Sequence, residues 1–369
     1  FGRILNLSEV KSMGADWGKN IQLSIFGESH GKVVGINIGG LPAGIKLDFD
    51  YINSQMARRK PGNGGLSTPR RESDAVEILS GVYDGYTTGA SLCAVIKNEN
   101  QNSKDYSYLK ELMRPGHSDY PAFVKYHGFN DVRGGGRFSG RLTAPLVFAG
   151  SVARQILRQK GIVVISHIQS IGGVRDEKFP HPITNDLIKR LKAMEYPLIC
   201  REKSIDMEKT VTRAKEKGNS VGGSIQCAII GLPAGIGDPF FDSVESKLSS
   251  ILFSVPAVKA VEFGDGFDLC QMDGSRANDE YAIENKKIIT KTNHNGGILG
   301  GITNGSPVVF TVGIKPTPSI SIPQNTVNVK TMTEEKLTVT GRHDRCIVYR
   351  ALPVIESVAA LAVLDMVNI

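Results

Sequence analysis

The chain has 369 residues, of which 44 are Lys or Arg and 37 are Asp or Glu, so that its formal net charge at neutral pH is +7. A hydrophobic content of 40% is ordinary for a soluble globular protein, and this length allows one large domain or two smaller ones. The charge is not gathered into a block of five or six like residues, which disfavours a basic nucleic-acid tail.

Five scattered cysteines, none of them in a C-x-x-C pair, argue against a disulfide framework or a zinc site. The most apolar segment, Ala351 to Val367, is interrupted by Glu356 and Asp365 and is shorter than the ~20 residues that a membrane span needs. It predicts a buried helix. No secretory signal opens the chain, so we expect a cytoplasmic protein, without a metal site and without a membrane span.

Residues 1–16 precede the first convincing strand and carry no starting Met. We interpret 1–16 as an N-terminal extension or a cloning remnant, and 17–369 as a single domain.

The first strand is indicated by Ile21, Leu23 and Ile25, which alternate with polar residues. It leads into the glycine-bounded loop Gly27–Gly31 with His30 at its tip, and a second strand is predicted from Val33 to Ile38.

A helix is predicted from about Asp50 to Arg59, and its last turn carries Arg58 and Arg59. The following segment, 62–69, is polar and rich in glycine, which predicts a mobile loop and a candidate lid. Further along, Arg114 to His117 forms another loop that ends on a histidine.

The run from Asp131 to Arg141 contains three arginines and four glycines in eleven residues. Consecutive glycines present bare N–H groups that form an anion-binding nest, and arginine forks suit phosphate and carboxylate oxygens. A helix predicted from Leu142 would add a partial positive charge at its N-terminus. The alternative is a flexible glycine loop with solvated arginines.

An internal repeat is visible in the sequence. Gly40–Gly44 (GLPAG) recurs as Gly231–Gly235, each time after an apolar strand and before a helix opened by aspartate. A second pair, Ile78–Val82 and Ile298–Ile302, follows in the same order. We therefore expect two related β-α halves packed as one unit, the alternative being that G-L-P-A-G is only a common turn.

Four segments besides the central run combine glycine or proline with charged or proton-transferring groups: Gly27–Gly31, Arg114–His117, Lys315–Ser319 and Gly341–Asp344. If they converge, His30 and His117 are candidate general acids near neutral pH, Asp344 is a candidate proton acceptor, and the arginines would hold a polyanion. Neither G-x-G-x-x-G nor a P-loop occurs, so nothing supports a Rossmann or nucleotide-triphosphatase site.

At this point the chain resembles the chorismate synthases. Gly27–Gly31, Arg133–Arg141 and the stretch from Arg342 to Glu356 match that family's three signatures in order and spacing, and the similarity runs from about Trp17 to the C-terminus.

The resemblance implies an α+β fold in one large domain, with a helical layer sandwiched between two antiparallel β-sheets, assembled as a homotetramer. It implies a carbon–oxygen lyase acting on phosphate. The enzyme would convert 5-enolpyruvylshikimate 3-phosphate to chorismate and phosphate by anti-1,4-elimination, within the shikimate pathway of aromatic amino acid biosynthesis. Reduced FMN would be required but not consumed, with an external flavin reductase or NADPH as the reductant.

The resemblance also implies roles for residues. His30 would protonate the departing phosphate, His117 would lie against the flavin ring, and Asp344 would assist removal of the C6 proton. The implied FMN contacts are Arg137, Phe138, Ser139, Ala257, Gly300, Lys315, Pro316, Thr317, Pro318, Ser319 and Arg342. The implied substrate contacts are Arg58, Arg59, Arg114, Ser139 and Arg141.

This chain departs from the family pattern at four positions. Phe138 stands where serine is common, so that only its backbone would contribute, and Pro256 replaces a common asparagine beside Ala257. Gly65 falls where an arginine is frequent, which removes that contact to the substrate or a pyridine nucleotide, and Arg345 replaces a usual proline, which affects at most the local turn.

A different class of function is a basic RNA- or DNA-binding protein that uses the Arg-Gly run. Only 7% of the residues are aromatic, and the basic groups lack the aromatic interleaving of a stacking platform, so we rank this reading second.

Overall fold

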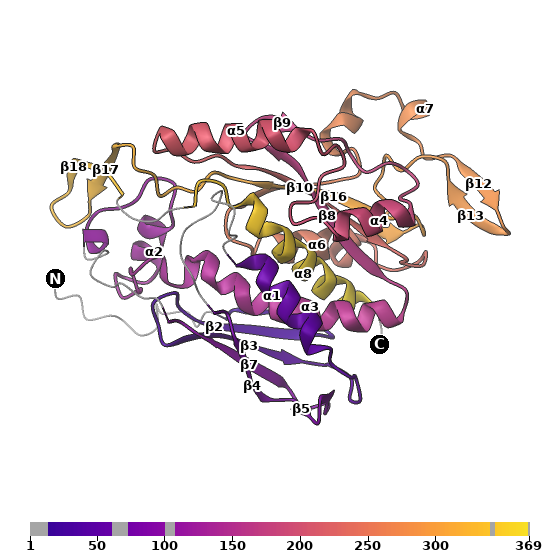
Figure 1. Cartoon of the computed structure of the whole chain (residues 1–369), viewed down its shortest axis with the longest axis horizontal. Helices are drawn as coiled ribbons and strands as arrows, with labels where there is room; N and C mark the ends of the chain where they lie inside the picture. Colours follow the sequence, from indigo (N-terminus) through magenta and orange to yellow (C-terminus); the bar gives the residue numbers. More distant parts are fainter. Residues whose placement is uncertain (1–13, 61–72, 100–107, 340–343, 368–369) are drawn as a thin grey trace.

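The computed structural model describes residues 14–60, 73–99, 108–339 and 344–367 (Figure 1). The glycine-rich loop expected at 62–69 and the implied flavin contact Arg342 lie outside the described residues, as does most of 1–16.

The first sheet is antiparallel and contains the predicted N-terminal strands. Its strand order is β1 (Asp16–Trp17), β2 (Gln22–Gly27), β3 (Val33–Gly39), β7 (Leu92–Lys97) and β4 (Val76–Ser80). Ile21 and Leu23 are buried as their alternation predicts, and the sheet packs one face on the interior.

The second sheet is also antiparallel and has the order β11 (Val258–Phe263), β16 (Val308–Ile314), β10 (Gly223–Ile230), β8 (Val163–Ile171) and β9 (Val174–Arg175). Most residues of its central strands β10 and β16 are buried.

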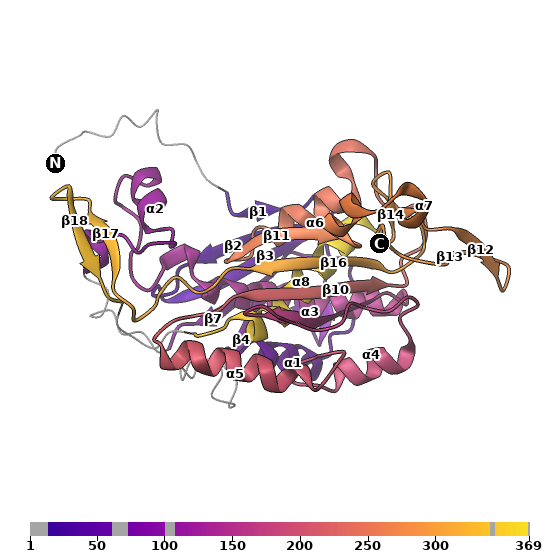
Figure 2. The same cartoon turned by 90° about the horizontal axis from the view of Figure 1, so that it is seen from above.

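A layer of helices separates the two sheets (Figures 1 and 2). It contains α1 (Phe49–Arg59), α3 (Thr143–Gln159), α6 (Val244–Leu252) and α8 (Val348–Met366), and α3 packs on the first sheet while α8 packs on the second. Two further helices, α4 (Asn185–Lys192) and α5 (Lys203–Glu216), pack along the β8–β9 side of the second sheet (Figure 2). The predicted sandwich is confirmed.

Helix α8 is the buried helix expected from the apolar C-terminal segment, and almost every residue in it is buried. Within the described part of the chain, no helix has the length and apolar character needed to cross a membrane.

The molecule is elongated, and its smaller elements gather at its two ends (Figure 2). One end carries α2 (Asp119–Lys125) and the hairpin of β17 (Gln324–Asn328) and β18 (Thr333–Leu337). The opposite end carries α7 (Gly274–Ala277) and two hairpins, β12 (Tyr281–Glu284) with β13 (Lys287–Thr290) and β14 (Ile298–Leu299) with β15 (Ile302–Thr303). Near the first sheet lies a short hairpin of β5 (Val82–Tyr83) and β6 (Tyr86–Thr87).

The internal repeat is confirmed by matching hydrogen bonds in the two halves. The amide of Gly44 donates to the carbonyl of Thr87 (2.7 Å), and the amide of Gly235 donates to the carbonyl of Thr303 (2.8 Å). Each threonine hydroxyl also donates to the proline carbonyl of its own G-L-P-A-G turn. The strands correspond as well, since β3 pairs with β7 and β10 pairs with β16.

Candidate active site

The glycine run lies between the two candidate histidines. Gly134, Gly135 and Gly136 all have positive φ, which L side chains rarely adopt. A Cβ atom on Gly134 would lie 2.5 Å from Nδ1 of His30, and one on Gly135 would lie 3.4 Å from Nε2 of His117. The run is therefore an ordered loop that lets both imidazoles approach the backbone, and not a flexible one.

His30 is buried and its ring is oriented by its neighbour. Ser29 Oγ lies 3.0 Å from His30 Nδ1 and donates to the carbonyl of Arg133 (3.3 Å), so that Nδ1 is the donor toward the serine. The amide of Ser29 donates to the carbonyl of Gly136 (3.1 Å), which ties this loop to the glycine run. Nε2 is thus the nitrogen with which His30 would do acid–base chemistry.

His117 is oriented by a carboxylate. Its Nδ1 lies 2.6 Å from Asp119 Oδ1, and Arg114 holds the same carboxylate through Nε (2.7 Å) and Nη2 (2.8 Å). Burial alone would raise the pKa of Asp119, but the hydrogen bonds from Arg114 and His117 hold it well below its usual range. A permanently ionised carboxylate fixes the tautomer of His117 and turns Nε2 toward Gly135. Arg114, an implied substrate contact, is engaged by Asp119.

The segment from Lys315 to Ser319 reaches the same place from the second sheet. The ammonium of Lys315 donates to the carbonyl of Gly116, next to His117, and the amide of Lys315 donates to the carbonyl of Ala257 (2.9 Å). Ser220 Oγ donates to the carbonyl of Thr317 (2.6 Å), whereas the buried hydroxyl of Thr317 has no hydrogen-bond partner within the described part of the chain. The structure therefore brings His30, His117, Ala257 and this segment into one connected region.

A chain of buried polar contacts borders the His30 loop. Asp74 accepts from Arg59 Nη2 (2.5 Å) and from Arg141 Nη1, and Arg141 Nε donates to Asn98 Oδ1 (2.8 Å). Burial would raise the pKa of Asp74, but the two guanidinium groups lower it below its ordinary value. Ser139 accepts the amide of Arg141 at the start of the turn before α3.

Asp344 lies at the other end of this series of polar contacts. Its Oδ2 accepts from Arg350 Nη1 (2.6 Å), and Arg350 Nε donates to the carbonyl of Arg59 (3.0 Å). Asp344 is thereby joined to the last turn of α1 through one arginine of α8.

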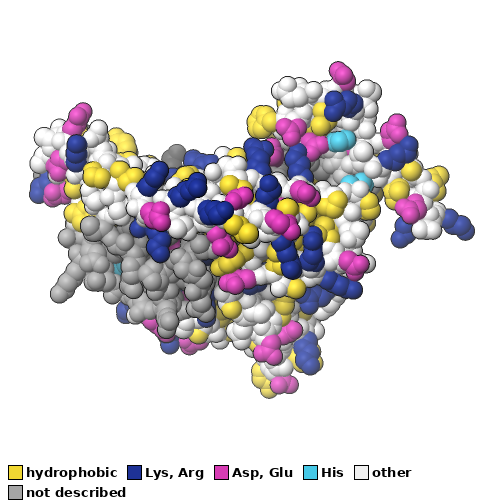
Figure 3. Space-filling model, turned by 45° about the horizontal axis from the view of Figure 1, so that its top comes forward, with side chains coloured by type: hydrophobic (Ala, Val, Ile, Leu, Met, Phe, Trp, Pro, Cys, Tyr) yellow, Lys and Arg dark blue, Asp and Glu magenta, His cyan; other side chains and the backbone are white. Residues whose placement is uncertain are grey.

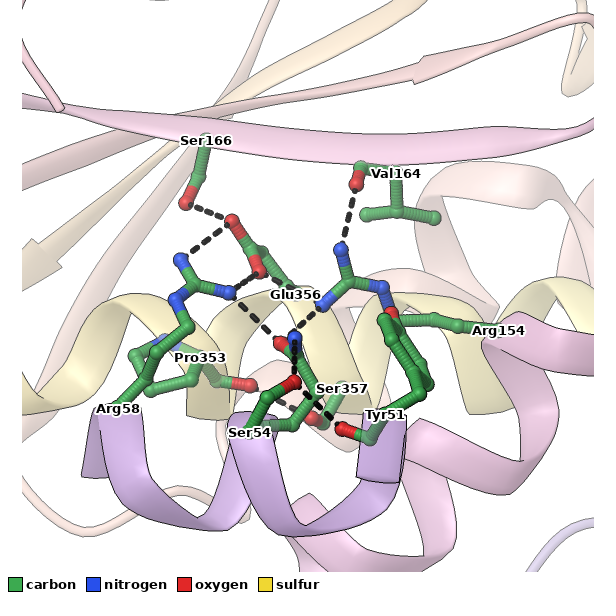
Figure 4. A network of polar contacts seen from close by, with 10 residues as sticks. Tyr51, Ser54, Arg58, Arg154, Val164, Ser166, Pro353, Glu356 and Ser357 are labelled. Carbon is green, nitrogen blue, oxygen red and sulfur yellow. Dashed lines mark hydrogen bonds and ion pairs between the residues drawn. The ribbon is translucent and has the colours of Figure 1, made fainter. Parts of the chain in front are cut away.

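Arg58 points into the helical layer (Figure 4). Its guanidinium binds Glu356 of α8 through both Nη1 (2.6 Å) and Nη2 (3.2 Å), while Arg154 of α3 and Ser166 of β8 bind the same carboxylate. The contacts of Arg58 thus anchor α1 to α8. The two neighbouring arginines of this helix turn therefore form ion pairs with different carboxylates: Arg58 with Glu356, and Arg59 with Asp74.

Two cavities adjoin the histidine region. One of about 670 Å³ is lined by His30, Gly31, Lys32, Lys97, Asn98, Glu99 and Arg133. The other, about 810 Å³, is more apolar and includes Trp17, Phe26, Glu28, Arg137, Leu146 and Pro256 among its lining residues. Arg137 also contacts Tyr126, through Nη1 to the phenol oxygen (3.2 Å) and over the ring, and Phe138 packs against the same ring.

Gly300 is separated from the other implied flavin contacts. It lies in the β14–β15 turn, next to the start of α6, because the amide of Val244 donates to the carbonyl of Gly301 (3.0 Å). Ala257 lies beyond the opposite end of α6, and Lys315 follows the far end of β16. A seven-residue strand spans roughly 20 Å, so the structure does not bring Gly300 to Lys315 within one chain.

Sequence reasoning missed Asp119, Asp74 and Asn98. A carboxylate two residues after a loop histidine is a weak signal that would have indicated Asp119. Asp74 and Asn98 act on groups 67 and 43 residues away along the chain, and no local pattern marks them.

Taken together, these features make this region a candidate active site: two buried or half-buried imidazoles face the glycine run, and arginines and a lysine surround them. The sequence comparisons identify the family. The family model for chorismate synthase matches residues 21–367. The chain is 43% identical over 354 residues to the chorismate synthase of Dehalococcoides mccartyi strain BAV1, covering 96% of both chains, and 44% identical over 349 residues to that of Thermococcus gammatolerans, covering 94% of this chain and 96% of the relative.

A crystal structure of a chorismate synthase superimposes with a TM-score of 0.72 at 25% identity, covering 95% of this chain and 92% of the other. The chain belongs to the chorismate synthase family.

Nothing favours the nucleic-acid-binding alternative. On the face seen in Figure 3, Lys and Arg side chains are interspersed with Asp and Glu, and they do not form one basic stripe.

Proposed function

We propose that this protein is a chorismate synthase that converts 5-enolpyruvylshikimate 3-phosphate to chorismate and phosphate with reduced FMN. Family membership over residues 21–367 supports the reaction. The observation that carries the assignment to this site is the placement of His30 and His117 on either side of the Gly134–Gly135 backbone.

His30 is the acid in this proposal. Its Nδ1 donates to Ser29, so in the imidazolium form Nε2 would carry the proton that passes to the departing phosphate oxygen. The neighbouring cavity, with Lys32, Lys97 and Arg133 in its lining, offers the positive charge that a phosphate leaving group needs.

Asp344 is the proton acceptor in this proposal, and it assists removal of the C6 proton. Arg350 orients its carboxylate through a charge-assisted hydrogen bond.

His117 would lie against the flavin, with Nδ1 fixed by Asp119 and Nε2 toward the glycine run. Arg114 acts through this pair, because its guanidinium binds Asp119 in bidentate fashion.

The residues present fit an FMN molecule. Among the described residues, the buried hydroxyl of Thr317 and a buried Nη1 of Arg345 have no partner, and these residues lie close together in the fold: Ser220 binds the carbonyl of Thr317, and the amide of Val221 binds the carbonyl of Arg345. Unsatisfied buried donors in and near the segment that carries Lys315 suit a phosphate. The 810 Å³ cavity beside Arg137 and Pro256 has the apolar character that a flavin ring prefers.

We therefore assign cofactor binding to Arg137, the backbone at Phe138 and Ser139, Ala257, and the segment Lys315–Ser319. When bound, reduced FMN supplies an electron-rich ring that the reaction does not consume. An external flavin reductase or NADPH would provide the reducing equivalents.

Substrate binding is assigned to Arg59 and Arg141, together with Ser139. Arg59 is buried, and its Nε has no hydrogen-bond partner among the residues that the structure describes, which offers a donor for a phosphate or carboxylate oxygen. Arg58, whose guanidinium is occupied by Glu356, contributes by holding the same turn of α1.

We also propose a homotetramer, and the separation of Gly300 from Lys315 within one chain is in keeping with a flavin site that a second copy completes. Gly300 would join a flavin site only if a second copy of the chain presented its β14–β15 turn to the site of the first. Size-exclusion chromatography with light scattering gives the oligomeric state, and a stable monomer that binds FMN fully would rule out this role for Gly300.

The five cysteines are all unpaired, in keeping with a reducing cytoplasm as the proposed location.

Anaerobic incubation with 5-enolpyruvylshikimate 3-phosphate tests the assignment. Chorismate and phosphate should form with reduced FMN, and not with oxidised FMN or without flavin. A DNA- and RNA-binding titration serves as the counter-test, because nucleic-acid affinity that falls log-linearly with salt in a protein without turnover would favour the alternative.

A further inference from the structure

Asp74 occupies the centre of the arginine cluster beside the active site. Its two oxygens take two different guanidinium groups, Oδ2 that of Arg59 and Oδ1 that of Arg141. All three side chains are at most 6% exposed, and that of Asp74 is completely buried. Both oxygens are therefore used to orient arginines, which leaves no clear role for Asp74 as a ligand of the substrate.

The backbone at Asp74 is held in a conformation that residues other than glycine rarely adopt. Its φ is +49°, in the left-handed region. Such a conformation is strained and persists where surrounding contacts determine it. Here the two ion pairs are those contacts.

The cluster is continuous with the His30 loop on one side. Arg141 Nε donates to Asn98 Oδ1 (2.8 Å), and Asn98 Nδ2 donates to the carbonyls of Glu28 (2.9 Å) and Gly31 (2.8 Å), which flank His30. A shift of Arg141 would therefore be transmitted to the loop that carries the proposed acid.

On the other side the cluster reaches Asp344. Arg59 binds Asp74 through its side chain, and its backbone carbonyl accepts a hydrogen bond from Arg350, which in turn binds Asp344. Asp74 thus stands midway between the two groups to which we assign proton transfer. Within residues 14–60, 73–99, 108–339 and 344–367, one buried donor of Arg59, Nε, has no hydrogen-bond partner.

We infer that Asp74 is a positioning residue of the substrate site, which fixes the guanidinium groups of Arg59 and Arg141 in the orientation that receives the anionic groups of the substrate. This inference rests on the proposed function. Asp74 acts through the two arginines and does not touch the substrate, so its loss weakens substrate binding more than it slows the chemical step.

The test compares Asp74→Asn and Asp74→Glu with wild type in steady-state assays with reduced FMN. Asparagine removes the charge at constant size. Glutamate keeps the charge but is longer by one methylene, so its carboxylate would shift both arginines from their positions. For both variants we expect KM for 5-enolpyruvylshikimate 3-phosphate to rise about 10- to 100-fold, as for other residues that orient ligand-binding groups, with kcat falling less than about tenfold. The dissociation constant for FMN should stay within about twofold of the wild-type value.

Asp176→Asn is the matched control. Asp176 is also buried and accepts the amides of Ile199 and Cys200, but it lies on the outer side of the second sheet beside His167. Its replacement should leave KM within about twofold of wild type. A rise in KM equal to that of the Asp74 variants would show a general loss of order and overturn the inference.

Two further outcomes are decisive. If Asp74→Asn does not fold, Asp74→Glu carries the test, because it keeps the buried charge, and Asn98→Ala, which cuts the link to the His30 loop, should raise KM in the same direction. A folded Asp74→Glu with wild-type KM would overturn the inference while leaving the enzyme assignment intact. A wild-type protein that forms no chorismate would instead refute the proposed function.

Discussion

Replacing Glu356 with Gln tests the buried ion cluster that joins the helices of the central layer (Figure 4). Burial alone would raise the pKa of Glu356, but the guanidinium groups of Arg58 and Arg154 outweigh it and lower the pKa from 4.5 to about 2. The difference, 4.5 − 2, is about 2.5 pH units, which corresponds to about 3 kcal/mol at 1.36 kcal/mol per unit. Breaking a buried ion pair from one side typically costs a similar amount. We expect Glu356→Gln to lower the free energy of unfolding by about 3 kcal/mol at neutral pH.

Urea unfolding of wild type and variant, at neutral pH and at successively lower pH, provides the assay. Because the folded-state pKa of Glu356 is depressed, its stabilisation is present above the unfolded-state pKa near 4.5 and is lost as pH falls from there toward 2. The difference in the free energy of unfolding between wild type and Glu356→Gln should therefore become smaller as the pH falls from about 4.5 toward 2.

Glu111→Gln is the control for this measurement. Its carboxylate is 43% exposed and pairs with Lys330 at the surface, so the change should stay below about 1 kcal/mol. If Glu356→Gln lowers the free energy of unfolding by less than about 1 kcal/mol at neutral pH, or by an amount that does not depend on pH, the proposed contribution of this ion cluster to stability is wrong.

Three further substitutions test the active site. His117→Ala should keep the fold, measured by circular dichroism, and reduce turnover with reduced FMN by about 10²- to 10⁴-fold, and wild-type turnover would remove His117 from the mechanism. Asp344→Asn should bind FMN normally but eliminate slowly, with a larger rate difference between unlabelled and C6-deuterated substrate, and an unchanged rate would mean that Asp344 only stabilises its turn. Asp119→Asn removes the charge that orients His117 and should reduce turnover about 10- to 100-fold, whereas an unaffected rate would show that His117 needs no carboxylate.

Much of the fold follows from local patterns in the sequence. The alternation at Ile21, Leu23 and Ile25 predicts β2, and the apolar segment after Ala351 predicts α8, because burial on one face or on all faces leaves a direct trace in the order of residues. The repeated G-L-P-A-G turn predicts the two halves, since equivalent turns need the same glycine and proline geometry.

The candidate site is only partly visible in the sequence, because its connections are long-range. Glycines beside arginines indicate an anion-binding loop, and the structure adds that Gly134 and Gly135 separate His30 from His117. No local pattern shows that Arg58 and Arg59, neighbours in α1, turn to different carboxylates.

The position of Gly300 relative to the candidate site could not be predicted from the sequence either. Its place in a turn is readable from the surrounding glycines, but its separation from Lys315 depends on the direction and length of β16. Such relations arise from strand pairing between distant segments, which a single sequence does not encode locally.

The most direct test of the proposed function is the stoichiometry of an anaerobic reaction in which reduced FMN is present at a much lower concentration than the substrate. The account predicts that chorismate and phosphate form in equal quantity, over many turnovers per flavin, and that the flavin absorbance returns to that of the reduced form at the end. Oxidation of one flavin for each product molecule, or phosphate release without chorismate, would contradict the claim that this site performs an elimination in which the flavin is required but not consumed.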